Sequence, residues 1–327
     1  MPKIVTIGGG SGQHGILTGL MNYSRMNPDK LKQENISAVV TTFDTGGHTG
    51  ELLEARKPRD TQGNYLPAGD IRQCLDAMAN NDEVRKLFRY RLKHGANHGT
   101  VVGNTLLDAA CEMEGDDFEK AIDLLRKFLE VRGNAYPCTT KRARFYGLLK
   151  NGRKIGGEDL LAEKAAWFMS PIQKISIEPE DIAANKNAVS EISKADIIVL
   201  SQGSLYTSLI PNIAVKEISD AIADSDAKKL YVMNIVTQRG ETDGFTAKDH
   251  VRTLEDYLGE DILDYIIIHS GGIPREQEVT YEQEGQKRVL DDLAEDSRTI
   301  RAELIAHDSP VLRHDPDKLA NVILELY

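Results

Sequence analysis

Five short runs of mainly apolar, β-branched residues recur along the sequence, and each leads into a loop of small or polar residues. These runs lie at 4–7, 37–42, 196–200, 229–235 and 265–269, and they show no alternation of apolar and polar positions. Stretches with helical periodicity lie between them, at 15–24, 71–79, 118–132, 211–223 and 248–258. Strands that are apolar on both faces are typical of a parallel sheet covered by helices on both sides. The pattern therefore predicts an α/β protein.

One segment breaks this alternation of strand and helix. Segments 142–149 and 153–155 flank Asn151-Gly152, the strongest short-range signal for a β-hairpin. We expect this hairpin at the edge of the sheet. It divides a single predicted domain, 1–327, into a first half (1–135), a hairpin insertion (136–178) and a second half (179–327). Both halves begin with a strand followed by a small-residue loop, so we expect one sheet with a crevice at the carboxyl ends of its strands.

Cap residues support two of the predicted helices. Asp116 or Asp117 can cap the helix that begins at 118, and Thr246 with Asp249 forms a capping-box pattern before 248–258.

A glycine-rich loop follows the first strand and opens a predicted helix. Its residues Gly10, Gly12 and Gly15 satisfy the GxGxxG pattern. Glycines let backbone N–H groups approach a phosphate at a helix N-terminus, so Gly9, Gly10, Ser11 and Gly12 are candidate phosphate ligands. The alternative is a tight turn without a ligand. An NAD site would add an acidic residue roughly 20 residues later, but the first suitable one, Asp44, follows Gly15 by 29 residues, so that interpretation rests on GxGxxG alone.

A second glycine loop follows the second predicted strand. It contains Asp44, Gly46, Gly47 and His48. Asp44 is a candidate ligand for a metal ion or for a substrate hydroxyl, and it is the candidate catalytic residue; the alternative is a turn or capping residue. His48 alone is more typical of a surface residue than of a metal ligand.

Two further turns carry polar residues at predicted helix starts. Asp70 occupies an N-cap position in its turn, and capping is its simplest role. Arg72 opposes the helix dipole unless an anion binds nearby, which makes it a candidate ligand residue. Asn104 can donate or accept hydrogen bonds in a turn whose alternative role is close helix packing.

The second half repeats this arrangement with hydroxyl groups. Segment 201–208 follows a strand and contains five hydroxyl side chains and a glycine. One helix cap needs one hydroxyl, so we favour phosphate binding at this loop. Arg239, in the loop after the next strand, offers a guanidinium suited to phosphate. The candidate binding residues in these two loops are Gly203, Ser204, Tyr206, Thr207, Thr237, Gln238 and Arg239.

Four of these loops, in order, resemble motifs of the family that joins the bacterial gluconeogenesis factor (YvcK-like proteins) to 2-phospho-L-lactate transferase (CofD-like proteins). The family's GGGTG, PPGDIR, GPGSLYTSxxPN and TQxGETxG correspond here to 8–12, 67–72, 201–212 and 237–244. The match spans nearly the whole chain and is closest to the gluconeogenesis-factor branch. The departure lies at 42–52, where the family has ADDGGSSGRL: Thr45 replaces one carboxylate and Glu51 replaces a basic residue.

The resemblance implies a Rossmann-like three-layer αβα fold, usually dimeric, with a nucleotide or nucleotide-sugar in the crevice. The transferase branch moves a phospholactyl group from a guanylyl donor to a deazaflavin alcohol with Mg²⁺. The gluconeogenesis-factor branch binds UDP-N-acetylglucosamine and supports cell-wall growth and cell shape on gluconeogenic carbon sources, with no established reaction. We expect the regulatory function, because Thr45 leaves a metal site at Asp44 one carboxylate short.

Composition narrows the classes of partner. The net charge of -11 repels nucleic acid and anionic lipid, so a bound phosphate must be held locally. The three cysteines form no CxxC pair, which indicates a reducing cytoplasm and no zinc ribbon. No segment reaches the roughly 18 apolar residues of a membrane helix, so we expect no membrane insertion.

Overall fold

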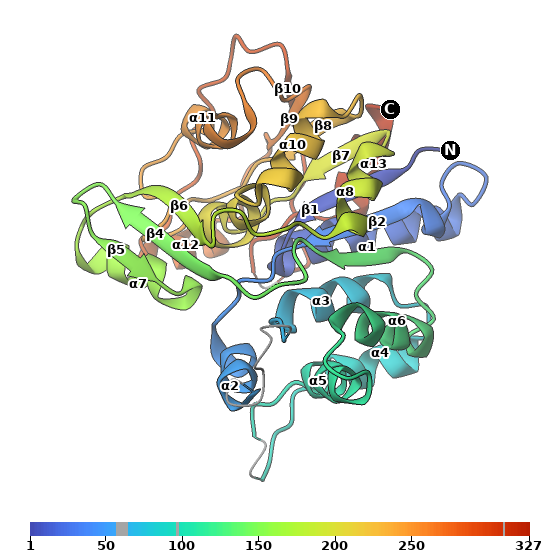
Figure 1. The fold of residues 1–327 in the computed structure, drawn as a ribbon. Coiled ribbons are helices and arrows are strands. Elements are labelled where there is room, and N and C mark those ends of the chain that lie inside the picture. The colour runs from blue at the N-terminus through green and yellow to red at the C-terminus, as the bar shows by residue number, and fades with distance from the viewer. Residues whose placement is uncertain (57–64, 96–97, 310) are drawn as a thin grey trace.

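The computed structural model describes residues 1–56, 65–95, 98–309 and 311–327 (Figure 1). Within these residues, a parallel sheet of seven strands has the order β10-β9-β8-β7-β1-β2-β3. Its strands are β1 (Ile4–Gly8), β2 (Ile36–Val40), β3 (Asn134–Pro137), β7 (Ile197–Leu200), β8 (Lys228–Val232), β9 (Tyr265–His269) and β10 (Thr299–Ala302). The central position of β1 puts the glycine-rich loop in the middle of the sheet's carboxyl edge.

Helices cover both faces of this sheet, which confirms the three-layer fold. Alternate strand residues face opposite ways: Ile4 belongs to one apolar cluster, and Val5 and Ile7 belong to the other. The first cluster packs beneath α1 (Gly10–Met26), α3 (Gly69–Met78), α5 (Val102–Met113), α6 (Phe118–Phe128) and α13 (Pro316–Glu325). The second packs beneath α8 (Lys186–Ser193), α9 (Ile210–Ile213), α10 (Lys216–Asp224) and α11 (Ala247–Leu258). Helices α2 (Gly47–Arg56) and α4 (Asp82–Phe88) add Leu53 and Phe88 to the first cluster, and Tyr281 of α12 (Arg275–Gln283) packs against a small third cluster.

All five predicted strands are present in the main sheet, and each predicted helical stretch contains a helix. The prediction did not include α2, α4, α8, α12 or α13. The edge strands β3 and β10 were not predicted, because each has only four residues and is partly exposed. Helix α1 begins at Gly10, five residues earlier than expected. The predicted helix 211–223 is two helices, since Val215 has an extended backbone that separates α9 from α10.

Both predicted helix caps are present, and the cap of α6 is Asp117 and not Asp116. Asp117 accepts a hydrogen bond from the Lys120 N–H at 3.1 Å and caps α6. Thr246 and Asp249 form the expected capping box of α11.

The hairpin forms as predicted, but it does not extend the main sheet. Strands β4 (Arg144–Leu149) and β5 (Lys154–Gly156) pair around Asn151-Gly152. Strand β6 (Ile172–Glu178) pairs with β4 on its other side, giving a separate antiparallel sheet in the order β5-β4-β6. The reason is burial: Phe145 and Ile175 pack with Ile213 of α9 in the second apolar cluster, instead of lying at an open edge.

Helix α7 (Glu158–Trp167) connects β5 to β6 and carries the insertion over the loops of the main sheet. The Glu158 N–H donates to the Thr45 hydroxyl at 3.1 Å, which ties α7 to the loop after β2. The Ala162 carbonyl oxygen lies 2.0 Å from where a side chain on Gly240 would begin, so α7 also packs on the loop after β8. Figure 1 shows α7 and the small sheet grouped at the left of the molecule, above α2. Among the described residues, no helix is both long and apolar enough to cross a bilayer.

Candidate functional site

The glycine loop, residues 8–12, joins the end of β1 directly to the first turn of α1. Gly9 is the N-cap with an extended backbone, and Gly10 opens the helix with φ +60°. Gly9 has no side chain to cap this helix end, and the carboxylate of Asp70 accepts a hydrogen bond from the Gly10 N–H instead. The positive φ at Gly10 favours glycine, and it turns the chain so that helix N–H groups face the carboxyl edge of the sheet. This is the local geometry that binds phosphate at a helix N-terminus.

The glycine loop packs against the hydroxyl loop, residues 201–208, which follows the neighbouring strand β7. A Cβ atom on Gly12 would lie 1.6 Å from the Gln202 carbonyl oxygen, and one on Gly8 would lie 1.9 Å from the Ser201 hydroxyl. Gly15, in contrast, has its nearest neighbour at 3.8 Å. Close packing against the Gln202 backbone at Gly12, and against the Ser201 side chain at Gly8, therefore explains these two glycines without a ligand and holds the two loops side by side.

Asp70 lies opposite the glycine loop and does not cap its helix. The N-cap of α3 is Ala68, and Asp70 sits in the first turn. A Cβ atom on Gly9 would lie 2.5 Å from the Asp70 carboxylate, which shows that this buried side chain points at the glycine loop. Burial, together with the charge of Asp44, raises the pKa of Asp70 to about 7.

Asp44 is held in a turn after β2 that its own side chain helps to form. Its Oδ1 atom accepts a hydrogen bond from the Gly46 N–H at 2.9 Å, so the expected turn role is present. Its other carboxylate oxygen would lie 2.6 Å from a Cβ atom on Gly69, at the start of α3. Burial raises the pKa of Asp44. Gly47 opens α2 with φ +51°.

Two glutamates that the sequence analysis did not single out complete an acidic cluster, defined as Asp44, Asp70, Glu158 and Glu241. Glu158 begins α7, and burial followed by repulsion from Asp44 raises its pKa to about 8; Asp70 and Glu241 add to the repulsion. No motif marked Glu158, because the insertion brings it to the loop after β2 only in three dimensions. Glu241 lies within segment 237–244, which resembles a family motif, and that motif could have marked it as a candidate site residue.

Glu241 uses the hydrogen-bond donors of the hydroxyl loop. Its carboxylate accepts hydrogen bonds from the Ser204 hydroxyl and, at 3.2 Å, from the Tyr206 N–H. The Thr207 hydroxyl donates to Ser204 and lies 3.5 Å from Glu241. Burial raises the pKa of Glu241. The hydroxyls of Ser204 and Thr207 thus face a carboxylate in this structure, and a phosphate there would have to displace or share it.

The acidic cluster could attract a cation but is not a ready-made cage. Within the described ranges, no group of three or more His, Cys, Asp or Glu side chains is arranged to hold a metal ion. Mg²⁺ is commonly bound by one or two carboxylates together with substrate phosphates. The carboxylate chemistry of Asp44 and Asp70 fits that kind of shared site, with a bound nucleotide supplying the remaining oxygens.

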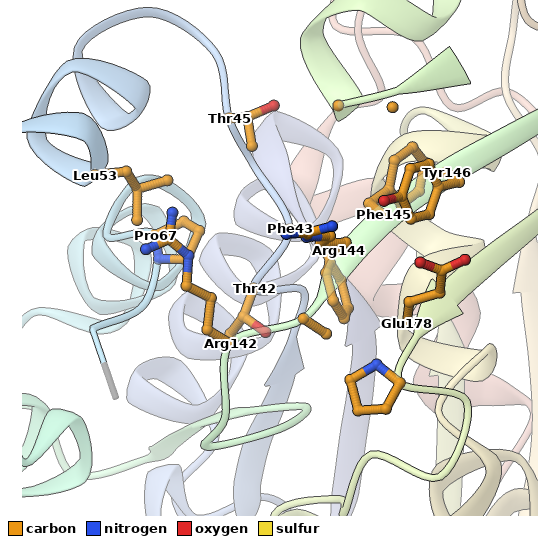
Figure 2. Close-up of a pocket in the computed structure, with 14 residues that line it drawn as sticks. Thr42, Phe43, Thr45, Leu53, Pro67, Arg142, Arg144, Phe145, Tyr146 and Glu178 are labelled. Carbon is orange, nitrogen blue, oxygen red and sulfur yellow. The ribbon is translucent and has the colours of Figure 1, made fainter. Parts of the chain in front are cut away.

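Two cavities lie along the carboxyl edge of the sheet, one on each side of the glycine loop. The hairpin cavity, about 880 Å³, lies at the end of β2 between Thr42, Phe43 and the small sheet. Figure 2 shows Phe145, Tyr146 and Glu178 of the small sheet on one side of this cavity, with Leu53, Pro67 and Arg142 on the other. It is therefore the cavity next to the loop that carries Asp44.

The amide cavity, about 430 Å³, lies on the other side, at the ends of β7 and β8. Ser11, Gly12 and Gly15 of α1 line it together with Gln202 and Gly203 of the hydroxyl loop. Gln238, from the loop after β8, lines the opposite side. The predicted residues Ser11, Gly12, Gly203 and Gln238 are therefore brought together here.

The structure does not bring every predicted residue to the glycine loop. The Tyr206 ring lies 6.3 Å from the Phe245 ring, edge to face, and lines a different cavity beside β6 and α11. The Thr237 hydroxyl accepts a hydrogen bond from the Lys287 N–H at 3.0 Å, a structural role. Arg239 is exposed, and it lines a small cavity with the end of α7 and Gly285 that contains no residue of the glycine loop.

Arg72 of α3 and Asn104 of α5 belong to two helices that pack against each other. The aliphatic part of Arg72 packs against Gly103, where a Cβ atom would lie 2.9 Å away. Burial lowers the pKa of Arg72, and its Nε atom has no hydrogen-bond partner among the described residues. Asn104 is buried in the first turn of α5.

Comparisons with known proteins agree with the motifs. The family model described as 2-phospho-L-lactate transferase CofD matches residues 4–309. A protein of Bacillus subtilis (strain 168) named gluconeogenesis factor is 33% identical over 331 residues, covering 99% of this chain and 98% of the relative. A second gluconeogenesis factor, from Halalkalibacterium halodurans, is 33% identical over 329 residues, covering 99% and 96%. A crystal structure of a Bacillus halodurans protein, described as a member of the UPF0052 family, superposes with a TM-score of 0.88 at 32% identity, covering 99% of this chain and 100% of that one.

Proposed function

Because the chain belongs to the CofD family, on the side of its gluconeogenesis factors, we propose that it is a regulatory protein that binds a nucleotide-sugar of the UDP-N-acetylglucosamine type. The proposal links it to gluconeogenic growth, cell-wall synthesis and cell shape, as a homodimer in the cytoplasm. The relatives' name supports the link to gluconeogenesis, and the family resemblance supports the choice of ligand.

One observation carries the binding part of this proposal. A helix N-terminus whose N-cap is a glycine lies between two cavities of about 880 Å³ and 430 Å³, at the carboxyl ends of adjacent parallel strands. Ligands of α/β proteins bind at this edge, and helix N-termini favour phosphates. A diphosphate at the glycine loop would have one cavity on each side for the two groups it joins.

A second candidate function is a Mg²⁺-dependent transferase of the 2-phospho-L-lactate transferase type. Thr45 appeared to leave the metal site short of a carboxylate, but the fold brings Asp70 and Glu158 towards Asp44. These raised pKa values arise partly from mutual repulsion, which a divalent cation would relieve. Bound there, Mg²⁺ would neutralise phosphate charge; Asp44 would hold it, and Asp70 would face the glycine loop.

Isothermal titration calorimetry distinguishes the two functions. Binding of UDP-N-acetylglucosamine and of GDP is measured in MgCl₂ and in EDTA. We expect UDP-N-acetylglucosamine to bind with the same affinity in both buffers. Strict dependence on Mg²⁺ with a clear preference for GDP would overturn the regulatory proposal in favour of the transferase.

Asp44→Asn provides a second readout of the same distinction. In a nucleotide-sugar binder the amide loses little more than one hydrogen bond, about 1 kcal/mol. In a transferase it removes a ligand of a hard cation, and the affinity for nucleotide in MgCl₂ should fall to the value measured in EDTA. The matched control is Glu163→Gln, an exposed carboxylate on α7.

A further inference from the structure

Three polar side chains that line the amide cavity have a buried atom without a hydrogen-bond partner. These atoms are Gln202 Oε1, Gln238 Oε1 and His314 Nε2. Gln202 and His314 are each only 8% exposed. A buried polar atom left unpaired is unfavourable by about 1–3 kcal/mol, so unpaired atoms around a single cavity indicate a ligand that hydrogen-bonds to them.

The other walls of the same cavity are apolar. Ile235, Val236, Leu312 and Pro316 line it, with the ring of Tyr281. Apolar walls with a few amide and imidazole groups suit a flat heteroaromatic ring, whose faces are apolar and whose edge carries donors and acceptors. A sugar, by contrast, carries hydroxyls around its whole rim and would leave several of them against these apolar walls.

The cavity also offers little to a phosphate. Burial holds the pKa of His314 at about 3, so its ring is uncharged at neutral pH. His14 lines the cavity too, but its Nε2 atom is paired with Asp76 at 2.9 Å. Arg313 is exposed. The unpaired buried groups are therefore neutral ones, suited to a neutral ligand group.

We propose that the amide cavity holds the nucleobase of the bound nucleotide, with Gln202, Gln238 and His314 hydrogen-bonding to its edge. The proposal rests on the nucleotide-binding function above. Because Ser11 and Gly12 line the same cavity, a base placed there leads directly to phosphates at the N-terminus of α1. The group attached to the distal phosphate then lies beyond the glycine loop, on the side of the acidic cluster and the hairpin cavity.

Two substitutions test the role of the cavity while keeping its shape. Gln238→Leu and His314→Phe each remove the polar atoms and retain a side chain of similar size; the Gln238 N–H, which donates to Thr242 at 2.9 Å, is unaffected. Gln173→Leu is the matched control, because Gln173 is exposed and lines a different cavity. Thermal unfolding of the ligand-free variants verifies that each is folded.

The probes are UDP, GDP, UDP-N-acetylglucosamine and inorganic pyrophosphate, titrated calorimetrically. For whichever of UDP and GDP binds more tightly, we expect each variant to bind about tenfold more weakly, which corresponds to one lost hydrogen bond. We expect the affinity for pyrophosphate to be unchanged in both variants, and the control to behave as the unaltered protein.

The titrations distinguish a failure of the proposed nucleotide-binding function from a failure of the assignment of the base to the amide cavity. No binding of any nucleotide to the unaltered protein would overturn the proposed function itself. Nucleotide binding that neither variant weakens, or that weakens together with pyrophosphate binding, would overturn only the assignment of the base. Loss of affinity for UDP-N-acetylglucosamine without loss for UDP would place the sugar in this cavity and would also overturn it.

Discussion

The two sides of the glycine loop differ sharply in charge. On the side of β2, Asp44, Asp70 and Glu158 of the acidic cluster lie close together, and burial raises the pKa of each; the fourth member, Glu241, comes from the loop after β8 and contacts the hydroxyl loop. On the side of β8, the amide cavity is lined by the buried groups Gln202, Gln238 and His314, which carry no charge at neutral pH. Both sides border the same helix N-terminus.

This difference indicates that the two ends of one ligand meet different chemistry. Neutral amides discriminate between donors and acceptors and suit a base, whereas protonated or cation-paired carboxylates suit hydroxyls or Mg²⁺. The acidic side is also unfavourable for folding, because like charges are held together away from water.

The largest effect is expected at the glycine that separates the two sides. Gly12→Ala places a Cβ atom 1.6 Å from the Gln202 carbonyl oxygen, so the two loops must move apart, and we expect the free energy of unfolding to fall by about 3 kcal/mol. Gly15→Ala, in the same helix with its nearest neighbour at 3.8 Å, should be neutral or stabilising by up to about 1 kcal/mol. Urea denaturation measures both, and equal effects at the two positions would contradict the packing described.

The acidic side should be destabilising in a pH-dependent way. The pKa of Glu158 rises from 4.5 to about 8 on folding, so the contribution of this one group to stability is most favourable below pH 4.5 and is lost as pH rises towards 8. Glu158→Gln should therefore stabilise the ligand-free protein at pH 8 by roughly 2–4 kcal/mol, at about 1.4 kcal/mol per pKa unit. The gain should vanish below pH 4.5.

Glu163→Gln, on the exposed surface of the same helix, is the control for this pH series and should change stability by less than about 0.5 kcal/mol at any pH. Denaturant midpoints at pH 4, 6 and 8 provide the comparison. A pH-independent effect of Glu158→Gln would exclude the repulsion that we assign to the cluster.

The guanidinium of Arg72, next to the acidic cluster, should contribute to the affinity for the nucleotide. Arg72 lies close enough to Asp70 for their charges to interact, but it forms no ion pair with a described carboxylate. Arg72→Met should weaken nucleotide binding by about 1.5–3 kcal/mol if the guanidinium contacts a phosphate. Arg89→Met, an exposed arginine at the end of α4, should not. Undiminished affinity in Arg72→Met would make Arg72 a packing residue of α3 and α5.

The smallest effect is expected at Arg239, the residue to which the sequence assigned a phosphate. Its side chain is exposed and lines a cavity without any glycine-loop residue, so Arg239→Ala should change nucleotide affinity by less than about 0.5 kcal/mol. A tenfold loss in calorimetry would show that the loop after β8 moves towards the ligand on binding.

Local sequence determined the secondary structure and the loops that reach the carboxyl edge. Five strands could be predicted because a strand buried on both faces must be apolar at every position, which is visible in any short window. Loop positions followed from those strands, so Asp44, Gly12 and Gln202 were placed at strand ends. The short edge strands escaped prediction, since partial exposure removes the apolar signal.

The tertiary structure alone decided which side chains meet. The strand order places the loop after β1 between those after β2 and β7, and no local pattern encodes that order. Glu158 reaches Asp44 because the hairpin insertion folds as its own sheet against α9, and His314 reaches Gln202 and Gln238 because the last segment returns to α1. The spacing of apolar residues within each helix or strand follows from which face of that element is buried, so it can be read from a short stretch of sequence. The charge and hydrogen-bonding character of the site, in contrast, arises from contacts between residues far apart in the chain.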